Sequence, residues 1–289
     1  MRRPHRLFLP FAGALRPRRY TVIGPLGPRL YTVIGAFLRQ REVVLALLCA
    51  LAASGQIAPP ASPALDPLQW EPEIRAFEET DRQSPPPTGG IVFAGSSSIR
   101  LWKALAGDFA GLPVLNRGFG GSQIREVTAF ADRMVIPYRP RLIVFYCGSN
   151  DVVSGRAVPD VVGDLQAFVR KIHAALPQTR LIYISIAPNP ARWHLKNAWL
   201  DLNERIRAYT RTDGRLSFVD IWGEMLAASG EPRPELFVED QLHMNERGYA
   251  IWARVLRPVV EKEFRRLTPT TSRDASAADP DGQRNGSRR

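Results

Sequence analysis

Short apolar runs alternate along most of the chain with longer segments of helical periodicity. Five mainly apolar runs have the length of buried strands, and they lie at residues 91–94, 113–116, 141–146, 180–186 and 216–219. The segments with helical spacing lie at residues 70–81, 123–134, 159–176, 197–210 and 245–264. Strands separated by helices pair in parallel through right-handed crossovers. The pattern therefore predicts an α/β protein, a three-layer α/β/α sandwich around a five-stranded parallel sheet.

Residues 1–58 form a basic leader with an apolar segment. Residues 1–42 hold nine Arg and one Glu, and the apolar run 43–53 follows them. A basic region, an apolar core of about 7–15 residues and small residues after it are typical of a secretory signal. The run is shorter than the roughly 20 residues that span a bilayer. We therefore expect export, to the periplasm or out of the cell.

Two alternatives for the leader stay open. The pentapeptide Tyr-Thr-Val-Ile-Gly occurs twice, at 20–24 and 31–35. An assigned start codon upstream of the real one would make part of the leader an artefact. The other alternative is that residues 33–38 and 43–53 form a retained anchor, which would associate the protein with a membrane.

The rest of the chain divides by composition into a linker, one folded domain and a tail. Residues 59–68 are rich in proline, which removes backbone donors and blocks helix, so they are expected to form a linker. The folded, catalytic domain is expected over 69–267. Residues 268–289 are rich in Ser, Asp, Arg and Gly and lack apolar periodicity. This tail is expected to be disordered.

Charge and residue spacing argue against several function classes. The net charge is +11, but residues 43–267 hold 26 basic and 24 acidic residues, so the expected domain has no concentrated basic surface for nucleic acid. No His, Cys or carboxylate cluster has metal-ligand spacing, and residues 118–121 lack the fingerprint of a phosphate loop. We therefore expect no cofactor, no metal and no nucleic-acid partner. Of the two cysteines, Cys49 lies in the leader, so the domain keeps only Cys147 and cannot form an internal disulfide.

Polar and small residues follow the first three predicted strands. They are found at 95–98, 120–121 and 148–151. Because the carboxyl ends of parallel strands open on one edge of a sheet, these segments are expected to meet there. Asp240 and His243 precede the last helix, and they join the others only if their loop returns to that edge.

This set of residues suits nucleophilic acyl transfer. A serine hydroxyl is a weak nucleophile until a base, itself oriented by a third group, accepts its proton. Asp240 and His243 can supply the orienting group and the base from one short segment. Donors for the developing oxyanion are also needed, and the backbone N–H groups of Ser97 and Gly121 and the side-chain amide of Asn150 can provide them.

The ordered motifs resemble the SGNH hydrolases, also called the GDSL esterase/lipase family, over about residues 90–260. The resemblance implies the flavodoxin-like fold of that family. It also implies that Ser97 is the nucleophile, that Gly121 and Asn150 are oxyanion donors, and that Asp240 and His243 complete the triad. The run Asn-Arg-Gly-Phe-Gly-Gly-Ser is similar to the second sequence block of the family.

One position departs from that family. Its usual Asp before the nucleophile is Ser96 here, which leaves three consecutive serines as candidates. Alignment on Gly95 and on Trp102, which falls where many members have Trp, favours Ser97 over its neighbours. The segment also lacks the second glycine of the G-x-S-x-G turn, which argues against an α/β-hydrolase.

The sequence therefore predicts a serine ester hydrolase that works through an acyl-enzyme. The alternative is a non-catalytic carbohydrate- or acyl-binding module on the same scaffold, for which Ser96 is the support. The substrate stays open among O-acetylated sugars, lysophospholipids, thioesters and other acyl esters, and the sequence makes no prediction of oligomeric state. Phe119, Trp193 and Trp199 are candidates for lining an acyl or sugar pocket, although aromatic residues in such loops more often serve packing. Asp151 and Cys147 are interpreted as structural, with the alternative that Asp151 shapes the site.

Overall fold

The computed structural model describes residues 67–266. Five strands form one parallel sheet in the order β2-β1-β3-β4-β5. Their bounds are β1 Ile91–Gly95, β2 Val114–Gly118, β3 Leu142–Tyr146, β4 Arg180–Ile184 and β5 Leu216–Val219. All five strands predicted from the apolar runs are confirmed, with ends that move by at most two residues.

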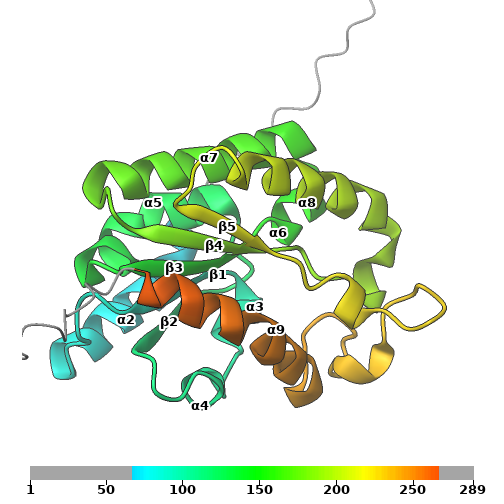
Figure 1. The fold of residues 1–289 in the computed structure, drawn as a ribbon, viewed down its shortest axis with the longest axis horizontal. Helices are drawn as coiled ribbons and strands as arrows, with labels where there is room; N and C mark the ends of the chain where they lie inside the picture. The colour runs from blue at the N-terminus through cyan, green and yellow to red at the C-terminus, as the bar shows by residue number, and fades with distance from the viewer. Residues whose placement is uncertain (1–66, 267–289) are drawn as a thin grey trace, which may run out of the picture. The chain divides into compact units, whose positions relative to one another are not determined.

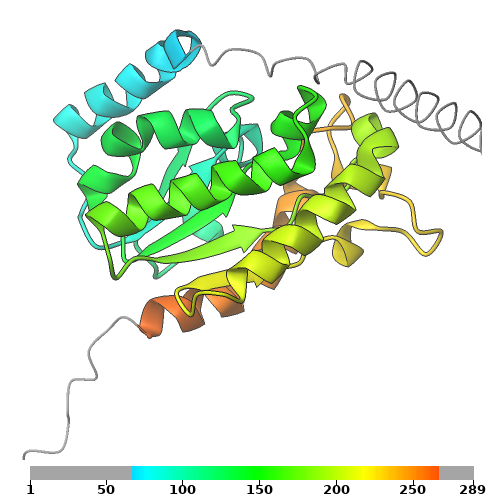
Figure 2. The ribbon, with the colours of Figure 1, turned by 90° about the horizontal axis from the view of Figure 1, so that it is seen from above.

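Helices cover both faces of the sheet, which confirms the three-layer α/β/α sandwich. The longer helices are α2 Glu71–Gln83, α5 Ile124–Met134, α7 Val158–Ala175, α8 Lys196–Thr210 and α9 Glu246–Arg265. The short ones are α3 Ser97–Arg100, α4 Leu105–Asp108 and α6 Ser149–Val153. Helices α5, α7 and α8 lie on one face, and α9 lies on the other with α3 and α4 (Figure 1). Seen from above, α7 and α8 run side by side over the sheet (Figure 2).

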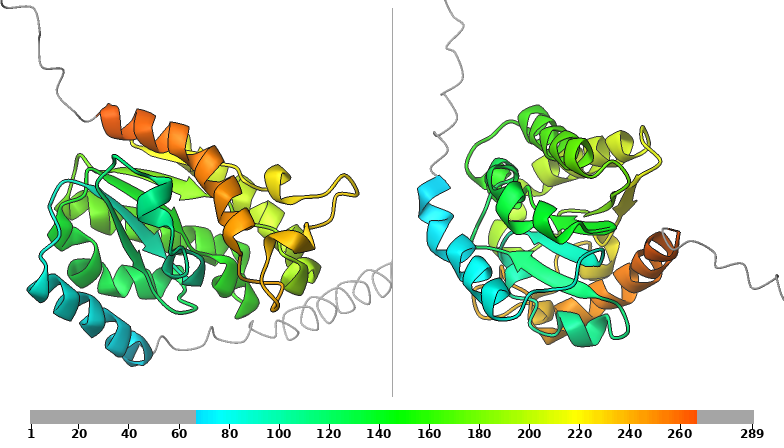
Figure 3. Two further views of the ribbon diagram at one scale, coloured as in Figure 1. Left: turned by 90° about the horizontal axis from the view of Figure 1, so that it is seen from below. Right: turned by 90° about the vertical axis from the view of Figure 1, so that its left-hand side faces the viewer.

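Helices α7 and α9 begin where their sequences favour a helix start. Pro159 lies in the first turn of α7, where its missing N–H costs no hydrogen bond. The Asn245 side chain caps α9 by accepting from the backbone N–H groups of Arg247 and Gly248. Helix α2 packs against α5, beside strand β2 (Figure 3), where Asp81 pairs with Arg117 of that strand.

The strand order places a topological switch between β1 and β3. From β1 the chain crosses to β2 on one side, and from β2 it returns to β3 on the other. Gly95 of β1 is in register with Gly118 of β2 and with Tyr146 of β3, so these three strands end level with one another. Crevices at such switch points bind ligands in open α/β sheets.

The predicted linker extends two residues too far into the described structure. Pro67 and Leu68, assigned above to the proline-rich linker, belong to a 3₁₀ turn, Pro67–Trp70, that leads directly into α2. The leader and the tail lie outside the described residues, so export and the tail's disorder stay predictions. Within residues 67–266, no helix combines the length and hydrophobicity needed to cross a bilayer.

Candidate active site

A closed turn before α9 brings Asp240 and His243 together. Phe237 and Met244 form an antiparallel bridge across its base, and the Val238 N–H donates to the His243 carbonyl over 2.8 Å. Inside the turn Gln241 has a φ of 54°, in the left-handed region. This tight path reverses the chain within four residues.

The Asp240 carboxylate makes two contacts with His243 and one with Leu242. Its Oδ1 accepts from the backbone N–H groups of Leu242 and His243, over 2.9 and 2.8 Å, and its Oδ2 lies 2.6 Å from His243 Nδ1. Burial acts to raise the pKa of the Asp240 carboxyl, but the hydrogen bonds from His243 and Leu242 outweigh it and hold the pKa below its ordinary value. A carboxylate at Nδ1 leaves Nε2 available as the acceptor.

The loop returns to the sheet edge, because His243 Nε2 lies 3.0 Å from Ser97 Oγ. Of the three consecutive serines, Ser97 is the one hydrogen-bonded to the imidazole. The contact joins residues 146 positions apart in the sequence. Packing of α9 against the segment after β1 supports it, since the Tyr249 hydroxyl donates to the Ser98 carbonyl and the Tyr249 ring stacks on Trp102.

Ser96 begins the short helix that carries Ser97. It is buried, its backbone N–H donates to the Tyr146 carbonyl over 3.1 Å, and its own carbonyl accepts from Ile99 and Arg100. The turn is therefore held by backbone bonds, without a carboxylate at position 96.

The other two predicted site residues lie beside each other. A Cβ built on Gly121 would be 3.7 Å from Asn150 Nδ2, so the bare backbone of Gly121 borders the Asn150 amide. Within the part of the chain that the structure describes, neither the Ser97 N–H nor the Gly121 N–H donates a hydrogen bond to a protein acceptor. Both stay available to a ligand oxygen.

Asp151 links two of these segments. Its side chain is fully buried, and its carboxylate accepts from the Ile124 N–H, the first of α5, over 3.1 Å. Burial raises the pKa of the Asp151 carboxyl to about 7, although the hydrogen bond from the Ile124 N–H acts to lower this pKa. Asp151 thus ties the start of α5, which follows the Gly121 loop, to the segment that carries Asn150.

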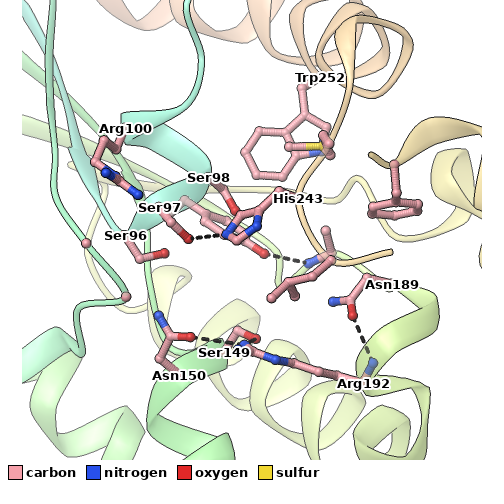
Figure 4. A pocket seen from close by; sticks show the side chains of 17 residues that line it. Ser96, Ser97, Ser98, Arg100, Ser149, Asn150, Asn189, Arg192, His243 and Trp252 are labelled. Carbon is pink, nitrogen blue, oxygen red and sulfur yellow. Dashed lines mark hydrogen bonds between the residues drawn. The ribbon is translucent and has the colours of Figure 1, made fainter. Parts of the chain in front are cut away.

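Ser97, Gly121, Asn150 and His243 line one cavity of about 190 Å³ (Figure 4). Several of its wall residues have no role predicted from the sequence, and these include Tyr146, Asn189, Arg192 and Trp252. Asn189 and Arg192 follow β4, so the strand-end argument could have placed their loop at this edge of the sheet. Nothing in the local sequence tells which residue of the loop turns inward.

None of the three aromatic residues suggested for the pocket lines this cavity. Phe119 and Trp199 are fully buried in the core. Trp193 stacks on Trp222, with ring centroids 5.8 Å apart. All three therefore have the packing role that is the more common one for aromatic residues in such loops. Tyr146, Phe237 and Trp252 supply the aromatic part of the cavity wall instead.

Cys147 directly follows β3, beside the site. It is a free, fully buried thiol whose Sγ lies 3.1 Å from the Ser122 carbonyl. Burial raises the pKa of this thiol well above its ordinary value, and Asp151 adds to the effect. Among residues 67–266, no group of three or more His, Cys, Asp and Glu side chains could hold a metal ion.

The chain matches the GDSL-like Lipase/Acylhydrolase family over residues 88–251. The match takes in more than half of the 289 residues and contains Ser97, Gly121, Asn150, Asp240 and His243. The chain belongs to this family. It is therefore an ester-bond hydrolase, and the resemblance found in the sequence is confirmed. Membership favours the enzyme over the non-catalytic binding module.

Individual relatives agree with the family. Platelet-activating factor acetylhydrolase IB subunit alpha1 of Homo sapiens is 27% identical over 183 residues, which are 59% of this chain and 74% of that protein. The same subunit of Pongo abelii is 26% identical over 203 residues, 66% of this chain and 82% of that protein.

Solved structures support the fold. A GDSL-like lipase from Bacteroides thetaiotaomicron aligns with a TM-score of 0.56 at 22% identity, covering 65% of this chain and 97% of that one. A carbohydrate esterase family 3 protein from Talaromyces cellulolyticus aligns with a TM-score of 0.51 at 16% identity, covering 63% of this chain and 100% of that one.

Proposed function

We propose that this acylhydrolase cleaves carboxylic esters through an acyl-enzyme on Ser97, with Asp240 and His243 as the other triad members. The observation that carries the proposal is the continuous chain of hydrogen bonds from Asp240 Oδ2 through both nitrogens of His243 to Ser97 Oγ. A nucleophile, a base and an orienting carboxylate in this order are the arrangement that serine acyl transfer requires.

In the acylation step, Ser97 Oγ attacks the ester carbonyl carbon while His243 Nε2 takes the hydroxyl proton. The carbonyl oxygen becomes an oxyanion, which the N–H groups of Ser97 and Gly121 and the Asn150 amide stabilise. The carbon–oxygen bond to the alcohol then breaks, and His243 returns the proton to the leaving alcohol. Throughout, Asp240 keeps the imidazole tautomer that leaves Nε2 free to accept.

Deacylation repeats the sequence with water. His243 Nε2 removes a proton from the water as its oxygen attacks the acyl carbon, and the same donors hold the second oxyanion. The bond to Ser97 Oγ breaks, the proton goes back to the serine, and the acid leaves. No cofactor is required for either half.

The proposed substrates carry a short acyl group, such as acetyl. The cavity at Ser97 holds about 190 Å³, whereas sites for drug-sized ligands hold roughly 300–1,000 Å³. The name acetylhydrolase of both relatives points the same way. An O-acetylated sugar and an acetylated lipid both carry a short acyl group of this kind.

The test is hydrolysis of aryl acetate by the wild type and by Ser97→Ala, with a fluorophosphonate as active-site label. We expect the variant to lose at least about 10³ in kcat and to lose labelling, with its melting temperature kept. Ser98→Ala is the matched control and should label normally. Wild-type turnover in Ser97→Ala would show that another residue is the nucleophile.

A homologous series of aryl esters from acetate to octanoate tests the preference for a short acyl group. Equal kcat/KM values along the series would contradict that preference.

A further inference from the structure

The Asn150 side chain is held at both ends of its amide. Its Oδ1 accepts a hydrogen bond of 3.0 Å from Arg192 Nη1, and its Nδ2 donates one of 3.1 Å to the Ser122 carbonyl. An amide nitrogen carries two hydrogens. One is therefore used by Ser122 and one is left, and Figure 4 shows this nitrogen on the side of Ser96 and Ser97.

Arg192 fixes which way round the amide lies. A guanidinium has five donors and no acceptor, so only the amide oxygen can face it. A flip of Asn150 would set its Nδ2 against the Arg192 donor and its oxygen against the Ser122 carbonyl, so both bonds would be lost and like groups would oppose each other. A cation on the amide oxygen also withdraws electron density from the amide, which strengthens the remaining N–H as a donor.

The loop between β4 and α8 holds Arg192 in this position. The Asn189 side chain, which is buried, accepts from the Arg192 backbone N–H over 3.0 Å. The Ala191 N–H donates over 3.1 Å to the carbonyl of Gln241, inside the turn that carries the histidine. Trp193 stacks on Trp222. The loop is thereby tied to the same turn as His243.

No acidic side chain of the described residues forms an ion pair with Arg192. Its other side-chain hydrogen bond within the described residues is a long one, 3.5 Å from Nη1 to Ser149 Oγ. Burial lowers the pKa of the guanidinium from its ordinary value. A partly desolvated cation whose main partner is one neutral amide has a stronger effect on that amide than an exposed one would.

We infer that Arg192 is a positioning residue for catalysis: it locks and polarises the Asn150 amide so that the free N–H of Nδ2 meets the oxyanion. The inference rests on the proposed function, in which Asn150 is an oxyanion donor. Arg192 belongs to none of the sequence motifs of the family named above.

The test is a double-mutant cycle between Arg192→Met and Asn150→Ala, read on a neutral aryl acetate. Removing one oxyanion donor costs about 10²–10³ in kcat. Arg192→Met alone is expected to lower kcat and kcat/KM equally, by about 10–100-fold, because the lost interaction is made only in the transition state. In the Asn150→Ala background the same change should cost less than about 2-fold, since two residues that act through one contact are not additive.

Matched variants and outcomes separate the explanations. Arg192→Lys keeps the charge and one donor, and should recover part of the loss. Arg211→Met, at an exposed arginine, controls for the removal of one positive charge.

Two outcomes would overturn the inference. One is an equal loss of kcat in both backgrounds. The other is a raised KM confined to anionic esters, which would make Arg192 a substrate anchor. If Arg192→Met melts early, the cycle is run with Arg192→Lys and the same criterion applies. A wild type without esterase activity would instead overturn the proposed function.

Discussion

Gly95 lies against the backbone of Tyr146. A Cβ placed on Gly95 would be 1.9 Å from the Tyr146 carbonyl oxygen, and Gly95 has a φ of 142°, which side chains rarely adopt. The same carbonyl accepts the Ser96 N–H over 3.1 Å. The backbone that presents Ser97 therefore turns so close to β3 that only glycine fits before it.

Gly95→Ala is therefore expected to destabilise the fold by about 3 kcal/mol or more, because it adds both a clash and backbone strain. The free energy of unfolding in urea measures this. Gly163→Ala is the matched control: this glycine lies within α7 with open space around its Cβ direction, so the change should stabilise the fold by about 0.5–1 kcal/mol. Equal stability of wild type and Gly95→Ala would contradict the packing of β1 on β3.

Asp240→Asn should lower kcat by about 10³–10⁴ at an almost unchanged melting temperature. The amide oxygen can keep the two backbone bonds of the turn, but the amide nitrogen then faces His243 Nδ1 as a donor. The imidazole is pushed to the tautomer with its proton on Nε2, where it cannot accept from Ser97. Asp213→Asn is the control, since its carboxylate lies 3.9 Å from His173 and away from the site. A kcat within tenfold of the wild type would argue against the role of Asp240.

The stability of the protein should depend on pH through Asp151. The folded protein holds the pKa of this carboxyl at about 7, above its ordinary 3.8, chiefly by burial. The folded state therefore binds the proton more tightly, and the stabilisation is complete below pH 3.8 and is lost as the pH rises through about 7.

Asp151→Asn removes this titration and retains an oxygen for the Ile124 N–H. The free energy of unfolding of Asp151→Asn relative to wild type is expected to rise between pH 4.5 and 7.5, as followed by urea titrations. Asp132→Asn, at an exposed carboxylate of α5, controls for the loss of one negative charge. A difference that stays constant with pH would show that Asp151 is not the group that titrates.

Cys147 should not react with thiol reagents in the folded protein. It is buried, and its raised pKa keeps it as the neutral thiol. In a Cys49→Ser background, which leaves Cys147 as the single thiol, we expect no release of thionitrobenzoate from Ellman's reagent and no loss of esterase activity. Denaturant should then expose one thiol. Rapid labelling of the native protein would mean that the end of β3 is accessible.

Export remains a prediction from the leader. Sequencing the N-terminus of protein made in a bacterial host is expected to find cleavage after the apolar run 43–53, among the small residues that follow it. Retention of the run in the membrane fraction would favour the anchor instead. A cytosolic protein starting near Met1 would contradict both.

The periodicity of apolar residues was enough to predict every strand and every long helix of the described domain. Burial along a strand or one side of a helix is decided by near neighbours in the sequence, so the pattern is legible without a structure. The sequence likewise predicted that Ser97, Gly121 and Asn150 lie at one edge of the sheet, because the carboxyl ends of parallel strands all lie at the same edge.

Only the tertiary structure decided the contacts that cross the chain. The approach of His243 to Ser97 depends on how α9 packs against the segment after β1, and the hydrogen bond from Arg192 to Asn150 depends on how one loop turns. The aromatic residues show the same limit, since Trp193 and Trp252 look equally suited to a pocket wall and only the packing turns Trp252 inward. Such choices depend on distances between residues far apart in sequence, which no local pattern of side chains encodes.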